Sequence, residues 1–516
     1  MKNTSKRLLA LILAALMLAP MTACSEQTPA ETDAPKTSAQ TTPAAETESE
    51  ETETEPAETE PPTEIELRQT IDDGLPDQTF NGRSFRVLTS EGGIEGQESA
   101  WYEILADEMT GDTLNDAVYN RNLRIEDRFD IDITCATEQK VYLYLNTFTS
   151  AGSDEYDLVG LSNYLAQYSI NAGSYLNWND AAYVDLTKPW HNQLANDAAT
   201  LYGTIYTLCS DLAISSMTYT YGIFFNTVLT ENYGYPSDSL YGMVNDGTWA
   251  IDQFIKITDS IYSDTNGNGD KDPEDTFGFG YQINNPADVW LAAFDQPITQ
   301  VNTEGGVDIT FLTDKTVSIL EKLLEWHYNS EGFCIYPTQY DEEKYFTAGQ
   351  MAFAPLRFRS AYSTLREMED TYSILPYPKW DEAQLQYLTN ADDKFTVFGM
   401  PKTIYNEMDF VSMIYEALCA ESYKTVYPEY YDTALKGRYS SEPETADMVD
   451  TIMAGRDFDF SFAFSRTFNS LCYAIRDHLS ANNPNISSYY NKMRKSLEKN
   501  AAKELKAVYQ TEETAE

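Results

Sequence analysis

Strands and helices alternate along the first part of the sequence, and this order restricts the chain to a small group of folds. Three apolar runs have the length of strands; a helical stripe separates the first two, and another helix follows the third. The strands are expected at residues 85–89, 131–134 and 156–160, the stripe comprises Leu114, Val118, Ile125 and Phe129, and the last helix starts at Tyr164. With short connections, this order predicts an α/β lobe with a largely parallel sheet.

The rest of the chain continues the mixed pattern and is long enough for more than one lobe. We expect β-rich runs at residues 204–208 and 219–226, a helix from Trp249 with Thr248 as its N-cap, a helix from Asp314 to about Tyr328, a strand at residues 395–400, and a last helix carrying Tyr489, Met493, Leu497, Ala501 and Leu505. The 516 residues are 42% hydrophobic and 13% aromatic, enough for large cores. At roughly 100–200 residues per domain, two to four domains or two large lobes are expected.

The N-terminus has the pattern of an export signal. A basic patch at residues 2–7 precedes an uninterrupted apolar run over residues 8–19, which is too short to span a bilayer but suits the core of a signal peptide. The sequence MTAC at residues 21–24 resembles a bacterial lipobox, in which the cysteine is diacylated and becomes the mature N-terminus. We expect residues 1–24 to be a lipoprotein signal peptide and Cys24 to be lipidated. An ordinary secretory signal with an incidental cysteine is the alternative.

An acidic low-complexity segment follows the expected signal. Residues 25–66 consist almost entirely of Glu, Thr, Pro, Ala and Ser. They show no apolar periodicity, so burial of apolar surface cannot offset the entropy lost on ordering them. We therefore expect a disordered linker that tethers the globular part, residues 67–516, to the lipid on Cys24 at the extracellular side of the cell membrane.

The charge balance excludes one class of partner. The chain has 82 acidic and 35 basic residues, which gives a formal net charge of -47. A polyanion of this size repels nucleic acid and anionic lipid surfaces. We expect no nucleic-acid partner, and contact with the membrane only through the lipid anchor.

Histidine and cysteine usage argues against two classes of enzyme and against a disulfide framework. The three histidines, His191, His327 and His478, lie far apart in the sequence. Histidine is the commonest general base near neutral pH and the commonest zinc ligand, so both chemistries are disfavoured, while catalysis by carboxylates alone remains open. Of the six cysteines, those other than Cys24 form an odd and widely spaced set, which favours free thiols.

Residues 264–275 carry the pattern of a calcium-binding loop. Oxygen donors stand at positions one, three and five, glycine at position six allows the sharp turn, and a carboxylate stands at position twelve, where Asp replaces the usual Glu. The expected ligands are the side chains of Asp264, Asn266, Asn268 and Asp275 and the backbone carbonyl of Asp270. We expect a structural calcium ion; an acidic Asn-Gly turn without metal is the alternative.

Several short blocks occur in a characteristic order between residues 83 and 510. They are YDLV at 156–159, GIFFN at 222–226, TWAIDQF at 248–254, the calcium-type loop running into TFGF at 276–279, FTAGQMAF at 346–353 and ILPYP at 374–378. Together they resemble the extracellular solute-binding lipoproteins of bacterial ABC importers, in the large carbohydrate-associated family usually numbered first. The resemblance implies a periplasmic-binding-protein-like fold, in which two α/β lobes joined by a hinge close over a ligand in the cleft between them.

The resemblance also implies where the lobes and the ligand site lie. The first lobe should cover about residues 80–215 plus later returning segments, and the second about residues 225–390, with residues 409–464 as a decoration of the second lobe. Sugars present apolar C–H faces and hydroxyls, which aromatic rings and polar side chains bind. By position in the family pattern, the ligand-binding residues would be Ser162, Asn163, Tyr221, Trp290 and Arg357. A role in packing or solvation is the alternative for each.

These features lead to one main functional hypothesis. The chain would be a non-catalytic, monomeric receptor that captures a carbohydrate, expected to be an oligosaccharide, and delivers it to the permease subunits of an ABC transporter. Closure of the lobes on the ligand would be the change that the permease recognises. Two alternatives remain: a surface glycoside hydrolase with two catalytic carboxylates, and a surface protein that binds glycan without transport.

Overall fold

Two β-sheets form the framework of the chain. The structure is a computed structural model, and it describes residues 63–90, 101–438 and 444–510. The first sheet has the strand order β13-β3-β1-β2 and consists of β1 (Arg83–Ser90), β2 (Ile131–Glu138), β3 (Leu158–Ser162) and β13 (Thr396–Gly399). β1 is parallel to β2 and to β3, whereas β13 is antiparallel to β3. The largely parallel sheet predicted for the first lobe is therefore confirmed.

The second sheet has the order β11-β4-β10-β6-β5, with β9 also paired to β6. Its strands are β4 (Tyr221–Asn226), β5 (Tyr262–Ser263), β6 (Thr276–Tyr281), β9 (Phe333–Ile335), β10 (Met351–Arg357) and β11 (Tyr372–Leu375). β6, β9 and β10 run parallel, and β4 is antiparallel to β10, so that Tyr221 lies opposite Arg357. Two small pairs join β7 (Thr299–Val301) to β8 (Val307–Ile309) and β12 (Thr389–Asn390) to β14 (Arg456–Asp457). The predicted class of two α/β lobes is thus borne out by two mixed sheets.

Helices pack against the first sheet on both of its faces. They include α4 (Thr113–Phe129), α5 (Val141–Ala151), α6 (Asn163–Asn171) and α16 (Met408–Lys424), with the shorter α2 (Glu64–Gln69), α3 (Trp101–Ile104), η2 (Trp178–Asp180), α7 (Gln193–Ala199), η4 (Lys402–Glu407) and α17 (Val426–Pro428). Asp112 caps α4 by accepting hydrogen bonds from two backbone amides, and Asp130 ends it in the left-handed conformation. Alternate residues of β1 face different cores: Val87 packs with α16, and Leu88 joins the larger cluster that continues into the second lobe.

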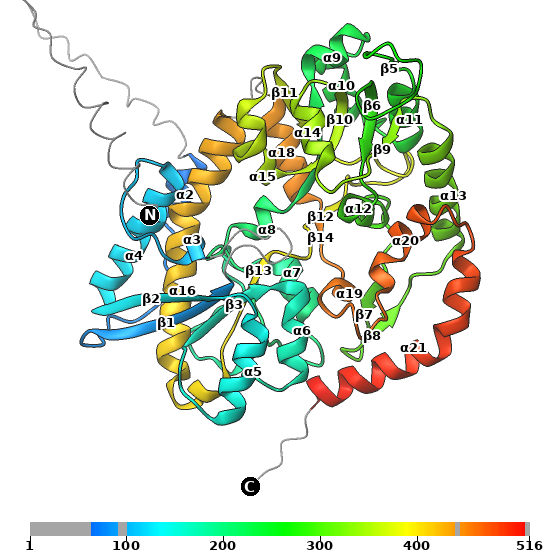
Figure 1. Cartoon of the computed structure of the whole chain (residues 1–516). Coiled ribbons are helices and arrows are strands. Elements are labelled where there is room, and N and C mark those ends of the chain that lie inside the picture. The colour runs from blue at the N-terminus through cyan, green and yellow to red at the C-terminus, as the bar shows by residue number, and fades with distance from the viewer. Residues whose placement is uncertain (1–62, 91–100, 439–443, 511–516) are drawn as a thin grey trace, which may run out of the picture. The chain divides into compact units, whose positions relative to one another are not determined.

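The second sheet is covered by helices from several parts of the chain (Figure 1). They are α9 (Thr227–Asn232), α10 (Ser237–Asn245), α11 (Ile251–Asp259), α12 (Asn285–Ala293), α13 (Asp314–Asn329), α14 (Asp341–Thr347), α15 (Phe358–Tyr362), η3 (Thr364–Glu367), η5 (Glu429–Arg438), α18 (Glu444–Ala454), η6 (Leu471–Tyr473) and α20 (Ala474–Ser480). The helix predicted from Asp314 is confirmed as α13, which begins with a capping box between Thr313 and Thr316. Its His327 is buried, as predicted.

Two short segments carry the chain from one sheet to the other. Residues 215–221, which begin with α8 (Ser215–Thr218), lead from the first lobe into β4, and residues 389–396 return from the second lobe to β13. The two segments touch: Thr220 and Ala391 form an isolated antiparallel pair, and the Thr389 hydroxyl donates to the Tyr221 carbonyl at 2.9 Å. We call residues 389–396 the returning segment. Figure 1 shows its strand β12, with β14, between the two sheets.

Helix α16 corrects the predicted place of residues 409–464, which were expected to decorate the second lobe. α16 packs along α4 and α2, and its Phe410 ring lies 6.0 Å from that of Phe85 in β1. This face of the first sheet is apolar, so another element must bury it. α16 can do so because nearly all of its sides are buried and mainly apolar. Further along, α18 packs on β11 of the second lobe, so the segment serves both lobes.

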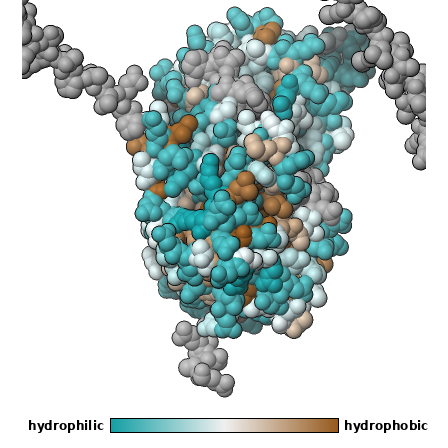
Figure 2. Space-filling model, turned by 90° about the vertical axis from the view of Figure 1, so that its left-hand side faces the viewer, coloured by the Kyte–Doolittle hydropathy of each residue, from teal (hydrophilic) through white to brown (hydrophobic). Residues whose placement is uncertain are grey.

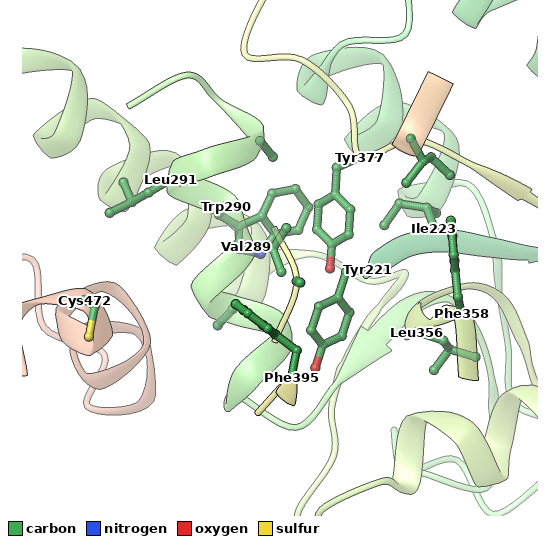
Figure 3. Packing of buried hydrophobic residues seen from close by; sticks show 14 of the residues in the cluster. Tyr221, Ile223, Val289, Trp290, Leu291, Leu356, Phe358, Tyr377, Phe395 and Cys472 are labelled. Atoms are coloured by element: carbon green, nitrogen blue, oxygen red, sulfur yellow. The ribbon is translucent and has the colours of Figure 1, made fainter. Parts of the chain in front are cut away.

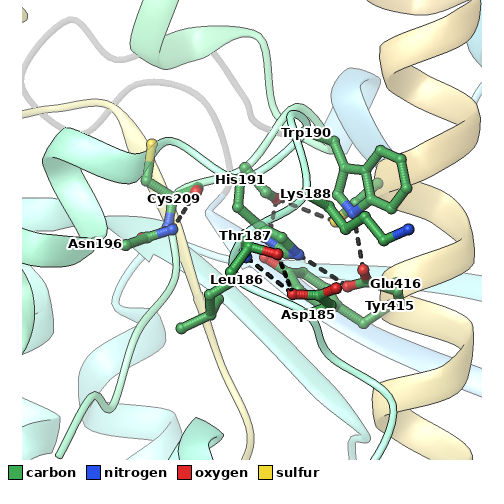
Figure 4. A network of polar contacts seen from close by, with 12 residues as sticks. Asp185, Leu186, Thr187, Lys188, Trp190, His191, Asn196, Cys209, Tyr415 and Glu416 are labelled. Atoms are coloured by element: carbon green, nitrogen blue, oxygen red, sulfur yellow. Dashed lines mark hydrogen bonds and ion pairs between the residues drawn. The ribbon is translucent and has the colours of Figure 1, made fainter. Parts of the chain in front are cut away.

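A buried polar network fixes α16 to the first lobe (Figure 4). Nε1 of Trp190 donates to Oε1 of Glu416 at 2.9 Å, and Nε2 of His191 lies 2.8 Å from the other carboxylate oxygen. The side chains of His191 and Glu416 are both fully buried. Histidine and glutamate are common acid–base catalysts, but this pair has no access to solvent and holds a helix in place.

Helix α11 begins two residues later than predicted, and Thr248 is not its cap. The N-cap position belongs to Ala250, which makes no side-chain capping bond. The Thr248 hydroxyl donates instead to the Met243 carbonyl, and the fully buried Trp249 donates its Nε1 hydrogen to the Pro376 carbonyl at 2.9 Å. A buried indole needs a partner for its N–H, and this bond holds Trp249 outside the helix.

Two further boundaries differ from the sequence-based predictions. The folded part starts before residue 67, because Thr63 and Glu66 form a capping box and α2 begins at Glu64. The run at residues 204–208 is not a strand; its backbone makes only isolated pairs, Leu201 with Thr204 and Leu208 with Phe398. The expected signal peptide, Cys24 and the rest of the linker lie outside the described residues.

The last helix, α21 (Ile486–Tyr509), connects the two lobes. Leu497, Ala501 and Leu505 are buried as predicted; at the start of the helix the predicted Tyr489 and Met493 are partly buried against the core, and Tyr490 is buried as well. The ring of Tyr490 packs against Phe311 of the second lobe. At the other end, the Val508 carbonyl accepts a hydrogen bond of 2.9 Å from the Tyr206 hydroxyl of the first lobe.

The exterior agrees with the acidic composition. The face in Figure 2 is mainly hydrophilic, with small apolar patches between the polar side chains. Within the described ranges, no helix is both long and apolar enough to cross a membrane. The five cysteines beyond Cys24 are free, and all but Cys135 are buried, as their odd number and spacing predicted.

Candidate ligand-binding site

A pocket lies at one edge of the second sheet, next to the segments that join the lobes. Its walls come from Tyr221 at the start of β4, residues 282–286 after β6, residues 339–343 around the start of α14, and residues 355–357 at the end of β10. The parallel strands β6, β9 and β10 all end at this edge. Open α/β sheets bind ligands in the crevice outside the carboxyl ends of their strands, so the topology marks this edge as the candidate site. We call it the Arg357 pocket.

Arg357 is the main positive charge of this pocket. Its side chain is 4% exposed, and Nη1 lies 3.3 Å from Oδ2 of Asp392, which also accepts a hydrogen bond of 2.8 Å from Asn285. The guanidinium lies over the rings of Tyr219 and Tyr340, at 5.3 and 5.4 Å from their centroids. Burial disfavours the ionised form of Asp392, but the charges of Arg357 and Lys394 and the hydrogen bonds from Asn285 and Asp393 together outweigh this effect, and the pKa of the carboxyl falls below its ordinary value. The ion pair therefore joins the returning segment to β10.

Two polar atoms in the lining lack a partner. Oε1 of Gln282 and the hydroxyl of Tyr340 are buried and make no hydrogen bond within the described part of the chain. Leaving such a group unpaired costs about 1–3 kcal/mol, so both atoms are suited to bind a ligand that supplies the missing bonds. Beside them, burial raises the pKa of Glu342 to about 7, which lets its carboxyl donate as well as accept near neutral pH.

A second arginine supports the pocket from the C-terminal part of the chain. Nη1 of Arg476 lies 2.8 Å from Oδ2 of Asp288 and donates to the side-chain oxygens of Asn284 and Asn285 at 3.1 Å. Both asparagines line the pocket. Because Arg476 holds the side-chain oxygens of both asparagines, their amide hydrogens are oriented as donors. The amide of Asn285 already donates to Asp392.

The structure brings together two of the five predicted ligand-binding residues. Tyr221 and Arg357 are opposite each other in the β4–β10 register and both line the pocket. Asn163 lines a different pocket on the other side of the returning segment. Ser162 is buried at the start of α6 and pairs with Thr396 in the first sheet.

Trp290 lies in the core of the second lobe rather than at the pocket surface. It is fully buried, and its Nε1 donates to the Tyr281 hydroxyl at 2.8 Å. Its ring packs 5.0 Å from that of Tyr377 and 5.3 Å from that of Phe294. Figure 3 shows Tyr377 beside the Trp290 ring, with its hydroxyl toward Tyr221. Trp290 is not among the residues that line the Arg357 pocket.

Several lining residues escaped sequence reasoning. Gln282, Asn284 and Asn285 follow directly after β6, and polar residues after a parallel strand are a usable signal. Asp392 and Arg476 come from distant parts of the sequence and carry no local signal. Their place in the site depends on how the chain returns between the lobes.

The predicted calcium loop connects β5 to β6. The carboxylate of Asp264 accepts hydrogen bonds from the amides of Gly267 and Gly269 at 2.6 and 2.9 Å, and Oδ1 of Asn268 accepts one from Asp270 at 2.7 Å. Asp275 is fully buried and accepts from the Thr265 amide. The ranges that the structure covers contain no group of three or more His, Cys, Asp or Glu side chains suited to a metal. Of the predicted ligands, Asn266 and Asn268 would bind calcium through side-chain amide oxygens and Asp270 through its backbone carbonyl, and a group of acidic side chains does not include such oxygens. Calcium at this loop therefore stays a prediction.

Comparisons with solved structures find many similar chains. No family model matches the chain, and no curated protein matches it. Among solved structures, maltose-bound MalE3 of T. maritima aligns at 13% sequence identity over 82% of this chain and 99% of that chain, with a TM-score of 0.47. The fold class of this chain rests on the two sheets described above.

Proposed function

We propose that this protein is the solute-binding component of a bacterial ABC importer and that it captures a carbohydrate of oligosaccharide size. The observation that carries the proposal is the position of the Arg357 pocket, at the carboxyl ends of β6, β9 and β10 and beside both segments that join the lobes. A ligand bound there contacts the part of the chain that bends if the lobes move. Ligand binding and lobe closure would then be coupled, which is how such receptors signal to a permease.

The chemistry of the pocket suits a neutral saccharide. The amides of Asn284 and Asn285 and the guanidinium of Arg357 offer donors, and Gln282 offers an unpaired acceptor. A sugar presents hydroxyls that both donate and accept, together with apolar C–H faces that rings such as Tyr340 can pack against. The block order in the sequence supports the same class of ligand.

A binding role is favoured over hydrolysis by how the carboxylates are used. Asp392 binds Arg357 and Asn285, and Asp288 binds Arg476. These contacts hold the two acids in structural ion pairs. Of the two carboxyls that line the pocket, Glu343 accepts hydrogen bonds from Ser360 and Thr364, and Glu342 is the neighbouring residue of the same helix. A glycosidase instead needs one carboxylic acid and one carboxylate placed on either side of the scissile bond. We therefore propose that the protein is not an enzyme.

The expected result of a binding screen is that at least one oligosaccharide in a panel of soluble glycans binds the purified protein, as measured by calorimetry. Gln282→Ala should weaken that binding by about 5- to 150-fold, which corresponds to the roughly 1–3 kcal/mol of one buried hydrogen-bond partner. Its stability should not fall, because Oε1 has no partner in the free protein.

The matched control is Gln386→Ala, an exposed glutamine that does not line the pocket. It should leave both affinity and stability unchanged. Binding of no saccharide, or equal losses in the two variants, would contradict the proposal. Release of reducing sugar during incubation would favour the hydrolase instead.

The membrane tether is part of the proposal. The basic and apolar N-terminus with its MTAC sequence supports lipidation of Cys24, and residues 25–62 would then connect the anchor to the globular part. Two acyl chains hold a protein on a membrane without any help from its charge. The proposed location is therefore the outer side of the cell membrane, next to the permease.

We also propose that calcium binds the loop at residues 264–275 in a structural role. A ligand that binds only the folded state at a hundredfold excess over its Kd adds about 2.7 kcal/mol to the free energy of unfolding. Chelation should therefore lower the melting temperature by several degrees, and added calcium should restore it. The Asp264 side chain would be a ligand, so Asp264→Ala should remove this response.

The control uses a residue of the same loop. Asp270 would bind through its backbone carbonyl, so Asp270→Ala should keep the response to calcium. An unchanged melting temperature of the wild type with and without calcium, measured by differential scanning calorimetry, would rule the ion out.

A further inference from the structure

A second pocket lies on the side of the returning segment that faces the first sheet. Its walls include Asn163 of α6, parts of α7, the returning segment itself and residues 457–463 around α19 (Phe460–Ala463). Much of the wall is aromatic and consists of Phe395, Phe458, Phe460 and Phe462. We call it the Asn390 pocket. It is separated from the Arg357 pocket by the Asp392–Asp393 pair of the returning segment, since Asp392 binds Arg357 and Asp393 lines the second pocket.

The side-chain amide oxygen of Asn390 indicates that a ligand of this pocket would be a hydrogen-bond donor. Asn390 lines the pocket, is 7% exposed, and its Oδ1 has no hydrogen-bond partner among the residues described. An amide oxygen buried in this way is costly unless something donates to it. The surrounding rings cannot do so.

The charges of the lining are of one sign. Asp393, Asp457 and Asp459 line the pocket, and the described lining contains no lysine or arginine. Asp459 is already saturated, because it accepts from the amides of Ile298 and Thr299 and from the Thr299 hydroxyl. Asp457 forms no ion pair within the described ranges. Two carboxyls and one amide oxygen thus line an aromatic cavity; the cations that face Asp393, Lys394 and Arg476, lie outside this lining.

Burial disfavours the ionised forms of Asp393 and Asp457, as expected for carboxyls in a pocket whose lining has no cation. It raises the pKa of Asp457 to about 6, with a further contribution from Asp459, and the pKa of Asp393 to about 7, with a further contribution from Asp392. Asp295 also faces Asp457, and Tyr473 and Lys394 face Asp393. A cation placed in the pocket would favour both ionised forms.

We propose that the Asn390 pocket is a second binding site, which takes an organic ammonium group carried on a compact ring. A primary ammonium has three hydrogens to donate, which match Asn390 Oδ1 and the carboxylates of Asp393 and Asp457. The ring packs among the phenylalanines, whose faces also attract the cation. This site is distinct from the Arg357 pocket and does not depend on the carbohydrate proposed there.

The test compares two probes of the same shape. Cyclohexylamine carries a ring and a permanent ammonium at neutral pH, and cyclohexanol replaces the ammonium by a hydroxyl. Titrated into the full-length protein at pH 7.5 by calorimetry, cyclohexylamine should bind at least about tenfold more tightly than cyclohexanol, a difference of about 1.4 kcal/mol. At pH 5, where Asp457 and Asp393 are mostly protonated, the affinity for cyclohexylamine should fall at least severalfold while that for cyclohexanol stays constant.

A substitution in the lining provides the second test of the Asn390 pocket. Asp457→Asn removes one charge with little change in shape and should weaken cyclohexylamine at least fivefold, whereas Glu369→Gln, which removes an exposed charge elsewhere, should not. Equal affinity for the two probes, or an affinity for the amine that does not change with pH, overturns the site. If Asp457→Asn fails to fold, the pH series on the wild type decides.

The outcome is separable from that of the glycan screen. Binding of the amine without any saccharide would support the Asn390 pocket and contradict the carbohydrate proposal. Binding of a saccharide without the amine would do the reverse.

Discussion

Replacing Arg357 by methionine should lower the free energy of unfolding by about 3–5 kcal/mol near neutral pH, as for other buried ion pairs that lose one partner. Methionine fills much of the same space but leaves the Asp392 carboxylate, 5% exposed, without its cation. The amide of Asn285, the backbone amide of Lys394 and the side chain of Asp393 still hydrogen-bond to Asp392, and the charge of Lys394 still favours its ionised form, though less than that of Arg357. Chemical denaturation followed by circular dichroism measures the loss.

The size of this loss should depend on pH. In the wild type the pKa of Asp392 lies below its ordinary value, so the ionised carboxylate contributes stability that persists until the pH falls through that low pKa. In Arg357→Met the pKa of the unpaired buried acid rises above the value of the unfolded chain. The folded variant then binds a proton more readily than the unfolded one, and its stability improves on acidification. The gap between variant and wild type should narrow from pH 7 to pH 4.

The control for this prediction removes both charges. Arg357→Met combined with Asp392→Asn removes both charges of the pair, so it should recover most of the stability that the single change loses. A single variant within about 1 kcal/mol of the wild type, or a gap that stays constant over this pH range, would show that the ion pair does not stabilise the returning segment.

The parts of the fold that were predictable from sequence are those with local causes. The strands β1, β2 and β3 and helix α4 have apolar patterns that depend only on their own residues, and all four formed as predicted. Residues 204–208 have strand propensity but no neighbouring strand along their length, and a strand forms only where a partner pairs with it. α16 was placed on the wrong lobe because its apolar sides do not specify which sheet they cover.

In the candidate site too, the residues with a local signal were predicted from the sequence, and the residues placed by the path of the chain were not. Tyr221 lies in the β-rich run predicted at residues 219–226, Arg357 follows the FTAGQMAF block by four residues, and the sheet register brings the two together. Asp392 and Arg476 complete the charges of the pocket, but they reach it only through the path of the returning segment and of α20. Trp290 was predicted to bind ligand from its position in the family pattern, but its helix neighbours Val289 and Leu291 are buried as well. A tryptophan flanked in this way belongs to a helix that is buried all round, as α12 is.

Replacing Trp290 by alanine should lower the free energy of unfolding by about 3–5 kcal/mol, the range for large aromatic side chains removed from a core. The change opens a cavity beside Tyr377 and Phe294 and removes the indole donor from the Tyr281 hydroxyl. The matched control is Trp380→Ala in the same lobe, where the ring is only partly buried and the cost should be smaller. Denaturant titration of both variants gives the comparison.

The changes in stability and in ligand affinity of a Trp290→Phe variant together distinguish a packing role from ligand contact. If Trp290 acts only in the core, Trp290→Phe should recover part of the stability, because phenylalanine fills part of the cavity, and the affinity for a bound saccharide should change little in that variant. A residue that stacks on the ligand would give the opposite pattern, in which affinity falls and stability does not. Since Tyr377 packs against the indole and Trp290 does not line the Arg357 pocket, a large loss of affinity in a fully stable Trp290→Phe variant would mean that the pocket opens toward Trp290 when ligand binds.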